Sequence, residues 1–245
     1  MRLLMDMGNS RAKWAFEDEL QRELVHQASS EDLSALIERL DPLPRPSAVH
    51  IASVLRPERM RQLSDWMQAH WQIQPRFAYT SEAELGVVNG YRQSQQLGVD
   101  RWLGLLAARE ISKQPLLVVD CGTATTLDAM DAEGRHLGGL ILPGLQLFQR
   151  CLMRETDMPD SHEPEAFDGF ATDTATGITS GAMLATTASV RSVLADLQQM
   201  GERDVQCILT GGFAAAVAQH LDLAYRLAPH LILQGLALQA GRADR

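Results

Sequence analysis

The chain has 245 residues, of which 45% are hydrophobic and 22% are charged, and its formal net charge is −9. That length allows one large domain or two of ordinary size. The acidic balance argues against nucleic acid or an anionic membrane as the main partner, because both require an excess of Lys and Arg. The three cysteines lie far apart, which disfavours a disulfide framework or a zinc site. No apolar run approaches the roughly 20 residues of a membrane span, so we expect a cytoplasmic protein.

The first half of the chain is predicted to alternate strands with helices. A hydroxyl cap near Ser29, followed by leucines and an isoleucine at helical spacing up to Leu40, predicts a helix. Pro57 predicts the start of the next helix, through Trp66 to about Trp71. Strands are predicted at 2–6, 12–17, 20–27, 48–54 and 76–79, and a further helix at 100–110. The glycine-punctuated segment 82–99, which contains Tyr91, is either a plain surface loop or part of a site.

The second half repeats this order. A buried strand beginning at Leu116 runs into Asp120 and the turn at Gly122, and the polar segment 154–173 is predicted to be a loop that covers a site. Further strands are predicted at 127–130, 136–142, 205–209 and 224–227, and helices from 143, over 174–200, up to 220 and over 231–240. The repeated order predicts a duplicated α/β fold, residues 1–112 and 113–245, with the two halves facing each other across a cleft where a nucleotide lies.

Two turns of similar composition begin the two halves. The first is Asp6-Met7-Gly8-Asn9-Ser10-Arg11-Ala12-Lys13 and the second is Asp120-Cys121-Gly122-Thr123-Ala124-Thr125. Gly lets backbone N–H groups approach a phosphate closely, hydroxyl groups add donors, and Arg11 and Lys13 offset the charge of a triphosphate. Alone, the first is also typical of a hairpin turn, and the threonines of the second also suit a strand. Because the pattern occurs twice, we favour phosphate binding.

Three acidic residues are candidates for chemistry. Asp100 is either a helix N-cap or a general base for a substrate hydroxyl, with Arg101 neutralising an anionic group. Asp6 and Asp120 are alternative bases, but a carboxylate that faces phosphate needs a cation between them, so metal binding suits them better.

Other polar residues offer less. The turn Thr210-Gly211-Gly212 is either a simple strand-to-helix turn or bare backbone against which an adenine or ribose lies. His136, His162 and Cys121 have no partner at a recognisable spacing, so we expect each to be solvated or in the core.

Taken together, five motifs resemble those of type III pantothenate kinases. They are Asp6-Met7-Gly8-Asn9-Ser10, Gly98-Val99-Asp100-Arg101, Asp120-Cys121-Gly122-Thr123-Ala124-Thr125, Gly138-Gly139-Leu140-Ile141-Leu142-Pro143-Gly144 and Leu209-Thr210-Gly211-Gly212. Several of them are shared across the actin-like and sugar-kinase superfamily, whereas Gly-x-Asp-Arg followed by Asp-x-Gly-Thr-Ala-Thr is more specific. The resemblance covers nearly the whole chain.

The resemblance implies two actin-like (RNase H-like) ATPase domains and ATP-dependent phosphorylation of pantothenate to 4′-phosphopantothenate, the first step of coenzyme A biosynthesis. It also implies a homodimer, Mg²⁺ with ATP, and a monovalent cation such as K⁺ or NH₄⁺.

The same resemblance implies roles for individual residues. Asp100 would be the catalytic base and Asp120 the ligand of the monovalent cation. Thr174 matches a family element in which Gly177 stands in place of Ala. ATP would be bound by Asp6, Gly8, Asn9, Ser10, Arg11, Lys13 and Thr123, and pantothenate by Tyr91, Gly98, Val99, Asp100, Arg101 and Thr174.

Two other classes of function remain open at the level of sequence. One is a regulatory or binding protein that hydrolyses ATP to switch conformation, although this length leaves no room for a separate peptide-binding domain. The other is a polyphosphate-type phosphohydrolase on the same fold, which needs no hydroxyl acceptor.

Overall fold

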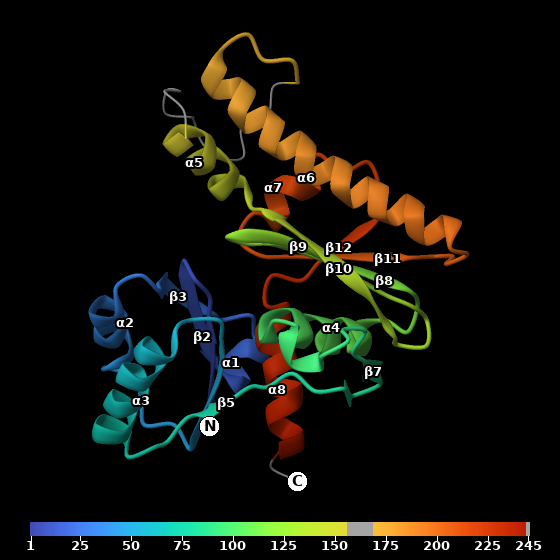
Figure 1. Ribbon diagram of the computed structural model, residues 1–245. Coiled ribbons are helices and arrows are strands. Elements are labelled where there is room, and N and C mark those ends of the chain that lie inside the picture. The colour runs from blue at the N-terminus through green and yellow to red at the C-terminus, as the bar shows by residue number, and fades with distance from the viewer. Residues whose placement is uncertain (156–168, 244–245) are drawn as a thin grey trace. The chain divides into compact units, whose positions relative to one another are not determined.

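A computed structural model of the chain describes residues 1–155 and 169–243, and it divides into two compact units, each with its own five-stranded sheet (Figure 1). Unit 1 contains Met1–Leu85, Tyr91–Ala107 and His230–Arg245, and unit 2 contains Gly86–Gly90 and Ala108–Pro229. The two sheets confirm the predicted duplicated α/β fold. The division into halves 1–112 and 113–245, and the cleft between them, stay predictions.

The sheet of unit 1 has the strand order β3-β2-β1-β4-β5. β1 pairs antiparallel with β2 and parallel with β4, so the three N-terminal strands form a meander and the other two are added by crossovers. The core side chains Leu3, Met5 and Met7 alternate along β1 and are fully buried. The strands are β1 (Arg2–Met7), β2 (Arg11–Phe16), β3 (His26–Ser29), β4 (Ala48–Ser53) and β5 (Arg76–Phe77).

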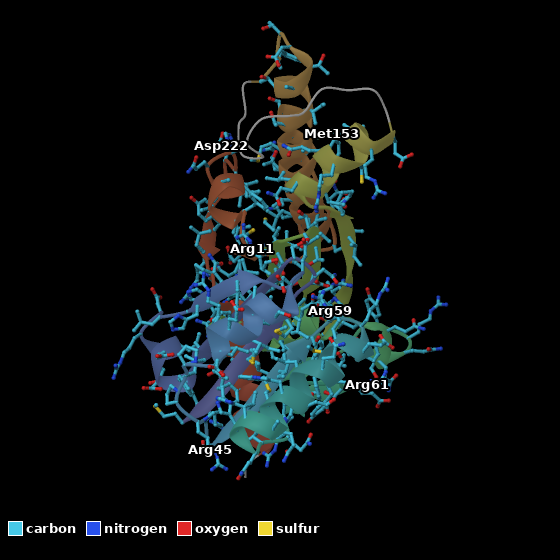
Figure 2. All side chains as sticks on the ribbon, turned by 90° about the vertical axis from the view of Figure 1, so that its left-hand side faces the viewer. Arg11, Arg45, Arg59, Arg61, Met153 and Asp222 are labelled. Carbon is cyan, nitrogen blue, oxygen red and sulfur yellow. The ribbon has the colours of Figure 1, made fainter. Side chains whose placement is uncertain are left out.

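The helices of unit 1 begin where local capping chemistry favours it. Asp32 caps α2, because its carboxylate accepts hydrogen bonds from the backbone N–H groups of Ser34 and Ala35. Arg59 of α3, labelled in Figure 2, donates to the backbone carbonyls of Ser30 and Glu31 and so ties α3 to the start of α2. The helices are α1 (Glu17–Gln21), α2 (Leu33–Leu40), α3 (Pro57–Trp71) and α8 (Leu231–Ala243).

Only short elements lie between β5 and the next long helix, α4 (Val99–Ile111). They are the two-residue strands β6 (Ala83–Glu84) and β7 (Val87–Val88) and the 3-10 turn η1 (Ser94–Gln96). The polar segment 82–99 is therefore largely irregular, as expected.

Unit 2 repeats the sheet of unit 1, with the strand order β10-β9-β8-β11-β12. Here too the three strands that come first form an antiparallel meander, and the other two join in parallel. The strands are β8 (Leu116–Cys121), β9 (Ala124–Met130), β10 (His136–Pro143), β11 (Gln206–Thr210) and β12 (Tyr225–Leu227).

The helices α5 (Leu145–Glu155), α6 (Thr174–Gln199) and α7 (Ala214–Ala218) belong to unit 2. Leu117 and Val119 of β8, Met183 and Val190 of α6 and Val217 of α7 are buried in one apolar cluster. Within residues 1–155 and 169–243, no helix combines the length and the apolar character needed to cross a bilayer.

The strand predicted at 20–27 is wrong. Residues Glu17–Gln21 form α1, and the strand β3 starts only at His26. The three acids in the first turn of α1 stabilise the helix, because their negative charges lie at the positive end of the helix dipole. Glu19 also accepts a hydrogen bond from the backbone N–H of Phe16. Of the predicted loop 154–173, residues 156–168, including His162, lie outside the described residues.

Candidate functional site

The first phosphate-type turn joins β1 to β2 and is a tight hairpin. The backbone N–H of Gly8 donates to the carbonyl of Arg11 over 3.1 Å, which leaves Asn9 and Ser10 at the tip. Asp6 lies opposite Lys13 in the strand pairing, and Arg11, labelled in Figure 2, is exposed. The hairpin interpretation is thus correct, and the same geometry presents the acidic, amide, hydroxyl and basic side chains at one strand end.

Tyr91 and Arg101 lie together in unit 1. The guanidinium Nη1 of Arg101 donates to the hydroxyl oxygen of Tyr91 over 2.7 Å, and its central carbon lies 5.5 Å from the centre of the tyrosine ring. Arg101 is only 9% exposed, so its charge is held in a defined place. An anionic or hydroxyl-bearing ligand would meet an ordered donor here.

Asp100 lies in the first turn of α4, one residue past the start of the helix. Its Oδ1 accepts a hydrogen bond from the backbone N–H of Arg101 over 2.8 Å. A Cβ on Gly98 would lie only 2.6 Å from the same oxygen, so any side chain at position 98 would displace the carboxylate. Gly98 is therefore needed for the observed position of Asp100.

The second phosphate-type turn joins β8 to β9 in unit 2. The backbone N–H of Gly122 donates to the carbonyl of Ala124, and that of Gly144, just before α5, donates to the carbonyl of Thr123, both over 3.1 Å. The turn is therefore fixed by its own strand pair and by the start of a helix. Thr123 is half-buried at the tip.

Asp120 lies at the carboxyl end of β8, opposite Thr210 of the parallel strand β11. Gly211 follows with φ of +94°, and a Cβ there would lie 2.4 Å from Oδ1 of Asp120. Only glycine fits, because both the backbone conformation and the space exclude a side chain. The two glycine-bearing strand ends predicted in this half thus come together.

Thr174 is the first residue of α6 and is exposed. The preceding Asp173 caps the helix, because its Oδ1 accepts from the backbone N–H of Thr176 over 2.9 Å. Within unit 2, Thr174 belongs to a helix terminus and not to the turn that carries Asp120 and Thr123.

Two groups that the sequence left without a role are core features. His136 and Asp128 are each 2% exposed, and His136 Nε2 lies 2.9 Å from Asp128 Oδ1. The core role expected for His136 is correct, but Asp128 as its partner was missed. Burial raises the pKa of Cys121 well above its ordinary range, with Asp120 and Cys207 adding to this, and burial raises the pKa of Cys207 to about 12. Both thiols therefore stay protonated near neutral pH.

The pKa of His230, just before α8 in unit 1, is affected by the charge of Lys13. Burial and the positive charge of Lys13 lower the pKa of His230 below its ordinary value, and Glu23 opposes them weakly. His230 is therefore mainly neutral near pH 7 and adds no positive charge beside Lys13.

The donor chemistry of the two acidic strand ends fits cations. Asp6 and Asp120 supply hard carboxylate oxygens at partly exposed strand ends, the donor type that Mg²⁺ and K⁺ prefer over nitrogen or sulfur. At Asp120 the backbone of Gly211 packs closely against Oδ1, since a Cβ at position 211 would lie 2.4 Å from that oxygen. Asp120 could thus hold a monovalent cation, and Asp6 a divalent ion that arrives with ATP.

Comparison with known proteins identifies the family. The type III pantothenate kinase family model matches residues 2–196. The type III pantothenate kinase of Nitrosococcus oceani is 35% identical over 246 residues, which cover 97% of this chain and 92% of the relative. That of Halorhodospira halophila is 36% identical over 248 residues, which cover 96% of each.

Solved structures support the fold. A Baf family transcriptional activator candidate from Campylobacter jejuni has a TM-score of 0.61 at 19% identity, with 99% of this chain and 98% of that chain covered. A 2-dehydro-3-deoxygalactonokinase candidate from Sinorhizobium meliloti has a TM-score of 0.55 at 13% identity, with 99% and 96% covered. At these identities the likeness shows the fold alone, which is the duplicated fold of sugar kinases and actin-like ATPases.

The family match spans the hairpin of Asp6, the α4 terminus of Asp100 and the turn of Asp120. The identity of 35% and 36% extends over nearly the full length of both relatives. The chain therefore belongs to the type III pantothenate kinase family.

Proposed function

We propose that this chain transfers the γ-phosphoryl group of ATP to the primary hydroxyl of pantothenate, the first step of coenzyme A biosynthesis, with Asp100 as the general base. The observation that carries this proposal is the family match together with the geometry at the start of α4. There Asp100 and Arg101 are fixed side by side, one by Gly98 and the other by Tyr91.

The chemistry follows from these side chains. A carboxylate within hydrogen-bond reach of the acceptor hydroxyl orients that oxygen and takes its proton as it attacks phosphorus. Arg101 and Tyr91 would bind the pantothenate carboxylate or one of its hydroxyls, because together they offer a cation and a phenolic O–H. Gly98 and Val99 would contact the same substrate through their backbone, and Thr174 would contact it from the start of α6.

The hairpin from Asp6 to Lys13 is proposed to bind the phosphates of ATP. The backbone at Gly8, the side chains of Asn9 and Ser10 and the charges of Arg11 and Lys13 would stabilise the transferring group by electrostatics. Thr123 would contribute a further hydroxyl donor. Mg²⁺ bound with ATP would supply charge neutralisation, and Asp6 is the carboxylate suited to hold it.

A monovalent cation, K⁺ or NH₄⁺, is proposed at Asp120. The support is the partly exposed carboxylate of Asp120 at the end of β8, a hard oxygen donor in the loop proposed to face phosphate. A single charge suffices there, because neutral oxygens can complete the coordination of a large monovalent ion.

A homodimer in the cytoplasm is proposed as the working form. Leu140 and Ile141 of the edge strand β10 are 51% and 63% exposed, and an apolar edge of this kind is typical of an interface. The three cysteines are free thiols, which suits a reducing compartment.

Substitution of Asp100 tests the proposed base. Asp100→Asn should bind ATP normally and lose about 10²-fold or more in kcat, the scale of general-base catalysis. Glu110→Gln, an exposed acid at the other end of α4, is the matched control and should retain wild-type turnover. An Asp100→Asn enzyme with undiminished kcat would leave Asp100 with a structural role alone, the hydrogen bond to the N–H of Arg101.

A further inference from the structure

The stretch between β5 and α4 must be held in place by contacts outside regular secondary structure. It carries Tyr91 and ends at Gly98, next to the proposed base, and its longest regular element has three residues. The side chains of Gln239 and Thr80 make hydrogen bonds to its backbone near its start and near its end.

Gln239 of α8 is buried, with 4% exposure, and pairs with the backbone of Tyr79 as a neighbouring strand would. Its Oε1 accepts from the N–H of Tyr79 over 3.2 Å, and its Nε2 donates to the carbonyl of Tyr79 over 3.0 Å. Nε2 also donates to the buried carboxylate of Glu84 over 2.8 Å. Both N–H donors and the oxygen of this amide are therefore used, and they fix the start of the stretch at Tyr79 and Glu84.

Thr80 links that start to the other end of the stretch. Its Oγ1 donates to the carbonyl of Leu97 over 3.1 Å. The next residue, Gly98, accepts the N–H of Trp102 over 3.0 Å and lies against the carboxylate of Asp100. A continuous set of short contacts thus runs from α8 through Tyr79 and Thr80 to the residue that sets the position of Asp100.

We propose that Gln239 and Thr80 are positioning residues for phosphoryl transfer. They fix the backbone that leads into α4, and so fix the place of Asp100 and Arg101 relative to the acceptor hydroxyl. This inference rests on the proposed function, in which Asp100 is the base. Loss of either contact lets the start of α4 shift, and misplacement of a reacting group by about 1 Å costs up to about 10²-fold in rate.

The test compares five variants with the wild-type enzyme, the fifth being a stability control, Leu233→Ala. Thr80→Val removes the hydroxyl at nearly constant volume, Thr80→Ser keeps it, and Gln239→Leu removes the amide. Gln234→Leu changes an exposed glutamine of the same helix and is the matched control. The measurements are kcat, KM for pantothenate, the Kd of ATP and Tm.

Thr80→Val and Gln239→Leu should each lower kcat by roughly 10-fold or more while the Kd of ATP stays within about 2-fold. Thr80→Ser should restore most of kcat, and Gln234→Leu should match the wild type. Leu233→Ala creates a cavity at a buried site of α8 and should lower Tm. At assay temperatures well below Tm it should leave kcat unchanged, which separates positioning from loss of stability.

Wild-type kcat in Thr80→Val would overturn the inference, as would equal losses of kcat in Thr80→Val and Thr80→Ser. A destabilised Leu233→Ala enzyme whose kcat falls as far as that of Thr80→Val would also overturn it, because loss of stability would then account for the effect. If Gln239→Leu does not fold, the two Thr80 variants decide. If ADP release by the wild-type enzyme does not rise when pantothenate is added, the proposed function and this inference are both wrong. An inactive Asp100→Asn beside a fully active Thr80→Val would overturn the positioning inference alone.

Discussion

Asp100 shows how one residue can perform a structural and a chemical task. Its Oδ1 accepts the N–H of Arg101 within the first turn of α4, two residues after Gly98, whose carbonyl accepts the first hydrogen bond of the helix. A carboxylate has two oxygens and several lone pairs, so this bond does not preclude contact with a substrate hydroxyl. The N-cap position is that of Gly98, so the N-cap interpretation of Asp100 is wrong, and the bond that Asp100 makes within the first turn is compatible with a role as base.

Local sequence motifs indicated the residues of the candidate site. Contacts between residues far apart in the sequence could not be predicted from such motifs. Gly98 and Asp100 are two positions apart, and their contact follows from the helix start. Gln239 and Tyr79 are 160 positions apart, and nothing in an apolar helix pattern indicates which buried polar residue pairs with a distant backbone. Asp128 beside His136 was missed for the same reason, because their contact depends on the pairing of β9 with β10.

The cation proposed at Asp120 gives a prediction at this scale. Replacing K⁺ with Na⁺ should lower wild-type kcat, because the smaller ion fits the same oxygens poorly. Asp120→Asn should remove the response to K⁺, since the site loses the negative charge of this carboxylate, whereas Asp222→Asn, at the exposed position labelled in Figure 2, should respond as the wild type does. The measurement is turnover against K⁺ concentration, and an unaltered K⁺ response in Asp120→Asn would contradict the assignment.

At the scale of elements, strands and helices with strong periodicity or a clear stop signal were predicted well. Pro57 opens α3 and the helix ends at Trp71, both as expected, because proline is preorganised for the first turn. The error at 20–27 arose because α1 has five residues, too few to show a helical period. The available signal was the run of three acids that forms its first turn, which favours a helix N-terminus.

Two helical glycines should respond oppositely to alanine. A Cβ on Gly177 of α6 meets nothing within 4 Å, so Gly177→Ala should raise the free energy of unfolding by about 0.5–1 kcal/mol through helix propensity. A Cβ on Gly235 of α8 would lie 2.1 Å from the carbonyl oxygen of Leu103, so Gly235→Ala should lower that free energy by about 1–3 kcal/mol.

Urea denaturation of both variants checks this pair. Equal effects of the two substitutions would show that space around the glycine does not decide the outcome.

At the scale of the whole molecule, the two sheets share one strand order and one pattern of antiparallel and parallel pairing. This similarity explains why the two phosphate-type turns occur at equivalent places, each between the first and second strands of its sheet. The sequence predicted the duplication from its repeated order of elements. It also placed residues 231–240 in the second half, whereas α8 packs against β1 and β4 of unit 1, a tertiary contact that no local pattern encodes.

The homodimer is tested through the edge strand. Ile141→Lys places a charge on the exposed apolar edge of β10 and should give a monomer, because burying an unpaired ammonium in an interface is costly. Leu24→Lys, at a site of unit 1 that is 55% exposed, is the control and should leave the assembly unchanged. Light scattering gives the mass, and a dimeric Ile141→Lys protein would exclude β10 as the interface.

The central claim is that this chain uses ATP to phosphorylate pantothenate. The most direct test is the rate of ADP release from ATP by the purified protein in the presence of Mg²⁺ and K⁺, measured with and without pantothenate. The account predicts slow release from ATP alone and a large increase with pantothenate, with one phosphorylated product formed per ADP. Release that does not rise when pantothenate is added would contradict it and favour an ATPase switch or a phosphohydrolase.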